Sequence, residues 1–275
     1  MRELRTHTDL KAAAGGDLLI VWAAQGMRPG VRAWASGDSV VVACPDLSRR
    51  HRIAVRGDAP TVATLVREAL RHVGPAYRPF GDIDLIKDVV ARLPELEFSA
   101  QFGWMDTGEA LPSGAALEEK QTTESHGDSA HGDSAHGDLA SPDPSPGVEW
   151  LKPDMDPEVT ALLEVAAPKS YAWPGVPWIR RWAGVRDPAG QLVAVAADAW
   201  PAPEVGFIAG VATHPQARGR GYARAVCRMV RDSLLADHGR VALMVDDDNA
   251  PAIALYRSLG MRWRPVAAAQ VRHSA

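Results

Sequence analysis

A low-complexity segment divides this chain, and it limits the possible folds more than any other feature. Residues 126–140 repeat the pentad His-Gly-Asp-Ser-Ala with one change, and residues 141–147 add three prolines. Such a segment buries too little apolar surface to offset the entropy lost when it is ordered. We therefore predict two folded parts, residues 1–106 and 148–275, joined by a flexible linker at 107–147.

The repeated histidines and aspartates raise the question of a metal site. Their spacing of five residues matches no regular set of metal ligands, and a solvated linker explains the composition better. The two cysteines, Cys44 and Cys227, are too far apart in the sequence to form a metal or redox motif. We expect no metal, no disulfide framework and a reduced, cytoplasmic setting.

Charge and hydropathy exclude two classes of partner. The net charge is −4, whereas a nucleic-acid-binding protein needs a surplus of Lys and Arg. The longest early apolar run, residues 18–24, is much shorter than the roughly 20 residues of a membrane span. We read this run as a buried element of a globular domain and expect neither nucleic acid nor membrane as a partner.

Strand and helix patterns alternate on both sides of the linker, which indicates an α/β fold in each part. In the first part we predict strands at 39–43, 51–55 and 97–104, with helices at about 58–73 and 82–93. In the second part we predict strands at 181–186, 191–200, 205–213 and 241–245, helices at 158–166, 220–238 and 251–259, and one or two strands within 261–271.

The most informative segment runs from Val211 to Arg224. A strand ends, a loop with two glycines follows, and a long amphipathic helix begins. Backbone N–H groups of such a loop, together with the unpaired N–H groups at a helix start, form a site for a pyrophosphate. Glycine-rich helix starts are also common without a ligand. The segment lacks the Gly-Lys-Ser/Thr of a Walker loop and the Gly-x-Gly-x-x-Gly of dinucleotide folds.

Two motifs resemble one known family. Gln216-Ala-Arg-Gly219-Arg-Gly221 is similar to the Gln/Arg-x-x-Gly-x-Gly/Ala signature of the GNAT acetyltransferase superfamily. Downstream, Asn249 and Tyr256 lie in an Asn…Ala-x-x-Leu-Tyr…Gly pattern typical of that family, with Met261 in place of the common Phe. The resemblance covers roughly residues 150–275. It implies a mixed central sheet flanked by helices, preceded by a degenerate GNAT-like domain without a cofactor site.

The resemblance implies acetyl-CoA as co-substrate, with no metal. Backbone groups of Val211 and Thr213 are expected to pair with the pantetheine arm, and amides from Ala217 to Tyr222 with the pyrophosphate. The full expected set of cofactor-binding residues is Val211, Ala212, Thr213, Gln216, Ala217, Arg218, Gly219, Arg220, Gly221, Tyr222 and Asn249.

The resemblance also assigns catalytic roles. Tyr256 is expected to protonate the leaving thiolate. Many relatives carry a general base, a Glu, shortly before the Asn, but here that stretch reads Met244-Val245-Asp246-Asp247-Asp248. Glu204 is the leading candidate for the base. Asp198, Asp246, His214 and a chain of water molecules are alternatives.

We therefore expect an N-acetyltransferase that moves an acetyl group from acetyl-CoA to an amine by direct attack. A non-catalytic acyl-CoA-binding or sensing module is the first alternative, because a kept cofactor loop with lost chemistry has a similar sequence. An interaction scaffold using the Trp-rich residues 173–182 is the second. The acceptor is a small-molecule or peptide amine that the sequence does not identify, and the protein is expected to be a monomer or homodimer.

Overall fold

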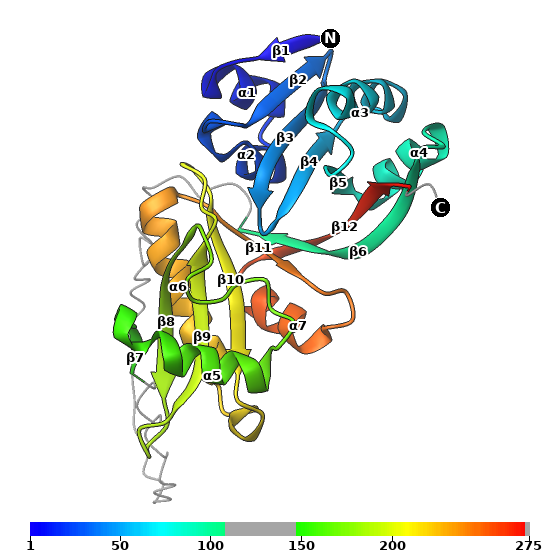
Figure 1. The fold of residues 1–275 in the computed structure, drawn as a ribbon. Helices are drawn as coiled ribbons and strands as arrows, with labels where there is room; N and C mark the ends of the chain where they lie inside the picture. Colours follow the sequence, from blue (N-terminus) through cyan, green and yellow to red (C-terminus); the bar gives the residue numbers. More distant parts are fainter. Residues whose placement is uncertain (108–146, 273–275) are drawn as a thin grey trace, which may run out of the picture.

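The computed structural model describes residues 1–107 and 147–272 (Figure 1). The His-Gly-Asp repeats, and with them nearly all of the predicted linker, lie outside the described residues. The two described segments fold into mixed α/β halves that share one order of elements, apart from an extra helix in the first. Within these residues, no helix combines the length and the apolar character that crossing a membrane requires.

The N-terminal half contains the strands and helices predicted from its sequence and several short ones that were not predicted. The run at 18–24 is a helix in which all seven residues are buried, as expected. The elements are β1 (Arg2–Leu4), α1 (His7–Ala14), α2 (Leu18–Ala24), a 3₁₀ turn (Gln25–Met27), β2 (Arg32–Ser36), β3 (Ser39–Leu47), β4 (Arg50–Arg56), α3 (Ala59–Val73), β5 (Arg78–Asp82), α4 (Ile83–Arg92) and β6 (Leu96–Asp106).

The C-terminal half follows the prediction closely, and residues 262–271 form one strand rather than two. Its elements are β7 (Val148–Trp150), a 3₁₀ turn (Pro153–Met155), α5 (Asp156–Ala166), β8 (Ile179–Arg186), β9 (Leu192–Ala199), β10 (Gly206–Thr213), a 3₁₀ turn (Pro215–Ala217), α6 (Tyr222–His238), β11 (Val241–Val245), α7 (Ala250–Ser258) and β12 (Arg262–Val271).

The two halves share one sheet because the last strand of each half pairs with strands of the other half. The strand order is β1-β2-β3-β4-β5-β12-β6-β11-β10-β9-β8-β7. Strand β12 of the C-terminal half lies between β5 and β6, and β6 of the N-terminal half lies between β12 and β11. The long antiparallel pair of β6 and β12 therefore runs through the centre of the molecule (Figure 1). The division into domains at 106 and 148 remains a prediction, since neither half has a complete sheet of its own.

Apolar residues form a core on each side of this sheet. Helices α3 and α4 pack on one face of the N-terminal half, and α6 and α7 on one face of the C-terminal half. A third cluster is shared by the halves and includes α1, α2 and α5. In this shared cluster the Trp22 ring of α2 stacks on Phe207 of β10, with 4.4 Å between ring centroids. The Trp22 indole nitrogen also donates to the Trp200 carbonyl at 2.9 Å, so buried aromatic contacts fix the halves together.

Candidate active site

The segment between β10 and α6 forms the strand–loop–helix that the sequence predicted. The loop leaves the sheet at His214, whose Nδ1 accepts a hydrogen bond from the Gln216 backbone N–H at 3.3 Å. Ala217 is buried and anchors the loop, and the Arg218 side chain turns back to donate to the Thr213 carbonyl at 3.4 Å. Arg220 is exposed beside the helix start. Contacts within the loop thus fix its conformation, and the positive charge of Arg220 lies at its exposed side.

Helix α6 begins without a side-chain cap. Its N-cap is Gly221, with φ of 82°, and within residues 1–107 and 147–272 no side chain accepts a hydrogen bond from the first-turn N–H groups. Gly219 has φ of 77°, and a Cβ added at either glycine would have no atom of the described residues within 4 Å. Unpaired amides, a positive helix end and open space beside two glycines are the properties of an anion site. The residues present therefore fit a pyrophosphate.

Beside the loop, β10 separates from β11. The parallel pairing joins Gly206, Phe207 and Ile208 to Val241, Ala242 and Leu243, and it extends no further, although both strands continue. On its other side β10 stays paired with β9 through Ala212 and Thr213, after an irregularity between Ala209 and Ala212. This bulge holds Gly210, with φ of 61°, and Val211. An extended ligand can pair with the free edge of β10 that results.

Helix α7 supplies the two residues predicted from the second motif. The Asn249 side chain caps the helix by accepting from the Ala252 N–H at 3.2 Å. Tyr256 is buried and packs with residues of α6, and burial raises the pKa of its hydroxyl well above the ordinary value. Across residues 1–107 and 147–272, this hydroxyl forms no hydrogen bond. Tyr256 therefore stays protonated and keeps its proton available.

Glu204 does not join this group. It precedes β10, whereas the loop follows it, and the strand between them spans about 23 Å at roughly 3.3 Å per residue. Its carboxylate accepts from Lys11 Nζ at 2.8 Å and pairs with His7 Nε2 at 2.9 Å, both on α1. Burial alone would favour its neutral form, but these partners outweigh burial and lower the pKa of Glu204. The contacts do not favour Glu204 as general base, and that role remains a prediction.

The alternative carboxylates differ in their surroundings. Asp198 of β9 is 1% exposed, and its Oδ2 accepts from Arg181 Nε at 3.2 Å. Burial raises the pKa of Asp198, but the residue lies beside Arg181, whose guanidinium also reaches Ser233 and Asp237 of α6. Asp246 is exposed.

Asp247 is a residue that the sequence did not distinguish. It lies in the loop between β11 and α7, and both carboxylate oxygens are out of contact with solvent and without a hydrogen bond among the described residues. Its buried position could not be predicted from the sequence, because three consecutive aspartates give no indication of which one points inward.

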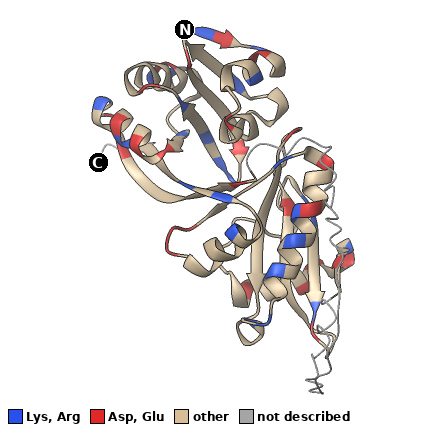
Figure 2. Cartoon of the chain, turned by 180° about the vertical axis from the view of Figure 1, so that it is seen from behind, with Lys and Arg blue, Asp and Glu red and all other residues tan. Residues whose placement is uncertain are grey.

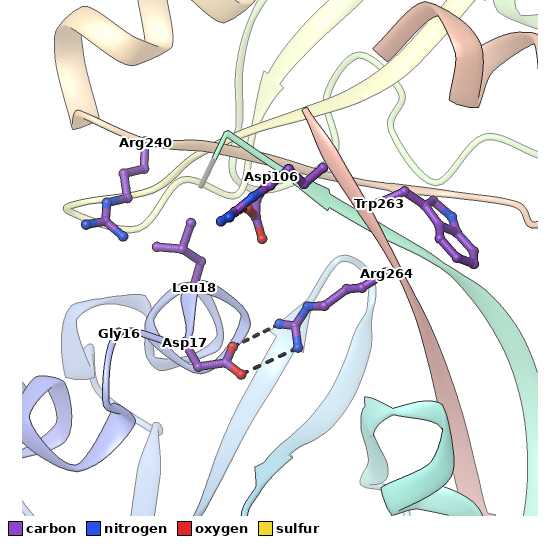
Figure 3. Close-up of a pocket in the computed structure, with 8 residues that line it drawn as sticks. Gly16, Asp17, Leu18, Asp106, Arg240, Trp263 and Arg264 are labelled. Carbon is purple, nitrogen blue, oxygen red and sulfur yellow. Dashed lines mark hydrogen bonds and ion pairs between the residues drawn. The ribbon is translucent and has the colours of Figure 1, made fainter. Parts of the chain in front are cut away.

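A separate cavity of about 410 Å³ lies where the halves meet (Figure 3). Its lining comes from the start of α2, the end of β6, Arg240 before β11 and the first residues of β12. Across it, Arg264 donates to both carboxylate oxygens of Asp17, the N-cap of α2, at 2.9 and 3.5 Å. This ion pair fastens α2 to β12. None of the predicted cofactor-binding residues lines this cavity, so it is not part of the loop site.

The mixed sheet, with parallel strands that separate beside a helix started by a glycine, lies in the part of the chain that matches a known family. Residues 145–261 match the family model described as the acetyltransferase (GNAT) family. These residues therefore form a GNAT acetyltransferase domain. No curated protein matches the chain.

Solved structures match over nearly the full length of the chain. A GCN5-related N-acetyltransferase from Kribbella flavida is 16% identical, with a TM-score of 0.57, over 94% of this chain and 97% of that one. A GCN5-related N-acetyltransferase-like protein from Streptococcus suis is 11% identical, with a TM-score of 0.50, over 97% and 98%. At such identities the likeness concerns the fold, and it extends to both halves.

Proposed function

We propose that this protein transfers an acetyl group from acetyl-CoA to an amine. One observation carries the proposal: an uncapped helix start with two open glycines lies directly after a strand whose edge is free. The loop fits the pyrophosphate of CoA, and the strand edge fits its pantetheine arm. The family of residues 145–261 supports acyl transfer as the reaction type.

The residues that would hold acetyl-CoA are among those predicted from the sequence. Backbone groups of Val211 and Thr213, beyond the last residue of β10 that pairs with β11, are expected to hold the pantetheine arm. The Ala217 and Arg218 amides already donate to carbonyls of the same loop, at 2.8 and 3.4 Å. The pyrophosphate is therefore expected to bind the amides from Gly219 to Tyr222, beside the open space at the two glycines. When bound, acetyl-CoA supplies a thioester whose carbonyl carbon an amine attacks, so that a C–N bond forms, the C–S bond breaks, and the thiolate leaves.

The chain then has three tasks. A backbone N–H in the bulge at Gly210 and Val211 stabilises the negative charge that develops on the carbonyl oxygen. The Tyr256 hydroxyl donates its proton to the sulfur. The proton released by the amine passes to water or to a carboxylate. Asp247 is a candidate, because both of its carboxylate oxygens are buried and have no hydrogen bond among the described residues.

Release of free CoA thiol tests the proposal. Acetyl-CoA is mixed with a panel of amines, and thiol formation is followed with the wild-type protein and with Asp198→Asn, Glu204→Gln, Asp246→Asn and Asp247→Asn. Turnover with at least one amine supports the proposal, and a loss confined to one variant identifies the base. Tight acetyl-CoA binding without thiol release from any amine would favour the sensing module instead.

A further inference from the structure

Three arginines lie together on the sheet of the N-terminal half. Arg52 of β4 is directly paired with Arg78 of β5, and Arg50 precedes Arg52 by two residues on the same face of β4. This is the face of the shared core, because Ala54 and Phe80, two residues further along the same strands, belong to it. Figure 2 shows basic residues along strands of this half that run toward the C-terminal half.

Arg52 is the unusual member of this arginine cluster. It is only 7% exposed; its Nε donates to the Leu47 carbonyl at 3.1 Å, and its guanidinium lies 5.2 Å from the centre of the Phe80 ring. Within the described residues, neither Nη atom has a hydrogen bond and neither is sealed from solvent. Burial lowers the pKa of Arg52 to about 10; Tyr171 acts against this lowering, and the smaller effects of Arg50 and Arg78 add to it.

The cluster lacks carboxylate partners. In the part of the chain that the structure describes, Arg50, Arg52 and Arg78 form no ion pair, whereas Arg181, Arg186 and Arg264 all do. Burying an uncompensated cation is costly, and an anion that pairs with it recovers that cost. The Nη groups of Arg52, which have no hydrogen bond among the described residues, are suited to donate to such an anion.

The arginine cluster is connected to the β10 bulge through the segment that precedes β8. Arg50 Nη2 donates to the Tyr171 hydroxyl at 3.2 Å, in the Pro- and Trp-rich segment before β8. The next residue, Ala172, lies against the β10 bulge, since a Cβ added at Gly210 would be 3.0 Å from the Ala172 Cβ. Two consecutive residues thus connect the arginine cluster to the bulge where the thioester carbonyl is expected.

The hairpin that presents the cluster is strained. Ser48 and Arg49 form the two-residue turn between β3 and β4, with φ of 54° and 58°. Two positive φ values are usual for Asn-Gly in such a turn and costly for other residues. Strain of this kind collects at functional sites, where the surrounding structure maintains it.

We propose that Arg50, Arg52 and Arg78 bind an anionic group, a carboxylate or a phosphate, on the acceptor amine. The N-terminal half then selects the acceptor for a reaction that takes place in the C-terminal half. This inference rests on the proposed acetyl transfer. A guanidinium donates two parallel hydrogen bonds to either anion, which makes the cluster specific for the charged group rather than for the rest of the acceptor.

Matched pairs of amines test the proposal. Glycine is compared with glycinamide, and phosphoethanolamine with ethanolamine, by kcat/KM in the thiol-release assay. For at least one pair, the wild-type protein is expected to prefer the anionic member by on the order of 10²-fold. In Arg52→Gln that ratio is expected to approach one. Arg71→Gln is the control, because Arg71 is an exposed α3 residue paired with Glu68, and it should keep the wild-type ratio. Equal rates for both members of every pair in the wild-type protein would overturn the proposal.

Arg52 also supports the β3–β4 hairpin, so its replacement can disturb folding. Arg50→Gln and Arg78→Gln are therefore measured as well, since both side chains are only partly buried, and each should reduce the preference for the anionic amine.

A second measurement does not depend on turnover. With CoA saturating the loop site, glutarate or inorganic phosphate should raise the melting temperature of the wild-type protein and not that of Arg50→Gln/Arg78→Gln. Anion stabilisation without turnover of any amine would support the anion site and reject acetyl transfer. No stabilisation by either anion, together with turnover that ignores acceptor charge, would reject the anion site and keep acetyl transfer.

Discussion

The two halves start the corresponding helix in opposite ways. Helix α3 is capped by Asp58, whose carboxylate accepts from the Thr61 N–H at 3.0 Å and from Ser39 Oγ at 2.9 Å. Helix α6 begins at the N-cap Gly221 and has no side-chain cap in the part of the chain that the structure describes. In the first half the Asp58 carboxylate occupies the position at the helix start where an anion could bind. In the second half the corresponding position is open. The same fold therefore carries a closed and an open version of one site.

A second difference lies one helix later. Helix α4 begins at the cap Asp82, and Val89 is seven residues on; helix α7 begins at the cap Asn249, and Tyr256 is seven residues on. The N-terminal half thus has an apolar side chain where the C-terminal half has a hydroxyl. The proposed cofactor loop and proton donor therefore both belong to the C-terminal half, whereas acceptor binding by the N-terminal half is the proposal made above.

The strongest test of this comparison separates the halves. Residues 148–275 alone lack β6, which pairs with both β11 and β12. We expect this fragment to be poorly folded and to show no measurable acetyl-CoA binding by calorimetry. Co-expression with residues 1–107 should restore binding, which controls for damage at the cut. Wild-type affinity in the isolated fragment would show that the shared sheet is not needed.

Removing the Tyr256 hydroxyl leaves an apolar side chain on α7, as Val89 is on α4 of the N-terminal half. Tyr256→Phe should lower kcat by on the order of 10²–10⁴-fold and leave the acetyl-CoA dissociation constant nearly unchanged, because the hydroxyl acts in the chemical step. Tyr77→Phe, in the N-terminal half, is the matched control and should keep the wild-type rate. An unchanged rate in Tyr256→Phe would remove this residue from the mechanism.

A side chain at the open start of α6 should remove the difference between the two halves in anion binding at the helix start. Gly221→Val places a side chain in the anion space and should weaken acetyl-CoA binding by on the order of 10²-fold. Gly239→Val controls for backbone strain, since Gly239 ends the same helix with φ of 77° and equally open surroundings. Similar losses of affinity in both variants would mean that strain, and not the anion site, is responsible.

Two further substitutions at Gly221 test whether charge at the helix start affects acetyl-CoA binding. Gly221→Asp imitates the carboxylate cap of α3, and Gly221→Asn has the same shape without the charge. We expect the aspartate variant to bind acetyl-CoA roughly tenfold more weakly than the asparagine variant at low salt. The difference should shrink as salt is added, because the contacts are exposed. Equal affinities at low salt would argue against an electrostatic role of the helix start.

The smallest expected effect concerns the closed site. Hydrogen bonds from Thr61 and Ser39 lower the pKa of Asp58 below its ordinary value. Its contribution to stability is therefore present above the pKa of the unfolded chain and is lost as the pH falls through the folded pKa. Asp58→Asn should have a lower melting temperature than the wild type at pH 7, and the gap should narrow in acid. A gap that is constant with pH would exclude the charge as its cause.

Local features could be predicted from the sequence, and long-range pairing could not. The loop and α6 depend on adjacent glycines and a helical pattern, so residues 211–238 were predicted correctly. The exchange of β6 and β12 depends on partners that alternating apolar residues do not specify. The contact of Glu204 with His7, which lies 197 residues away, leaves no local signal either. Likewise Arg52, within Arg49-Arg50-His51-Arg52, has the sequence of an exposed basic turn.

The position of β12 also affects how the chain emerges during synthesis. Because β12 contains residues 262–271, the edge of β5 that faces away from β4 gains this partner only after those residues have left the ribosome. Ordinary tandem domains mature one after the other, with the first complete before the second is made. Here the N-terminal half has an exposed edge on β5 until β12 is made, and an exposed strand edge promotes aggregation. A premature stop codon before residue 262 would thus leave both halves immature, not only the second.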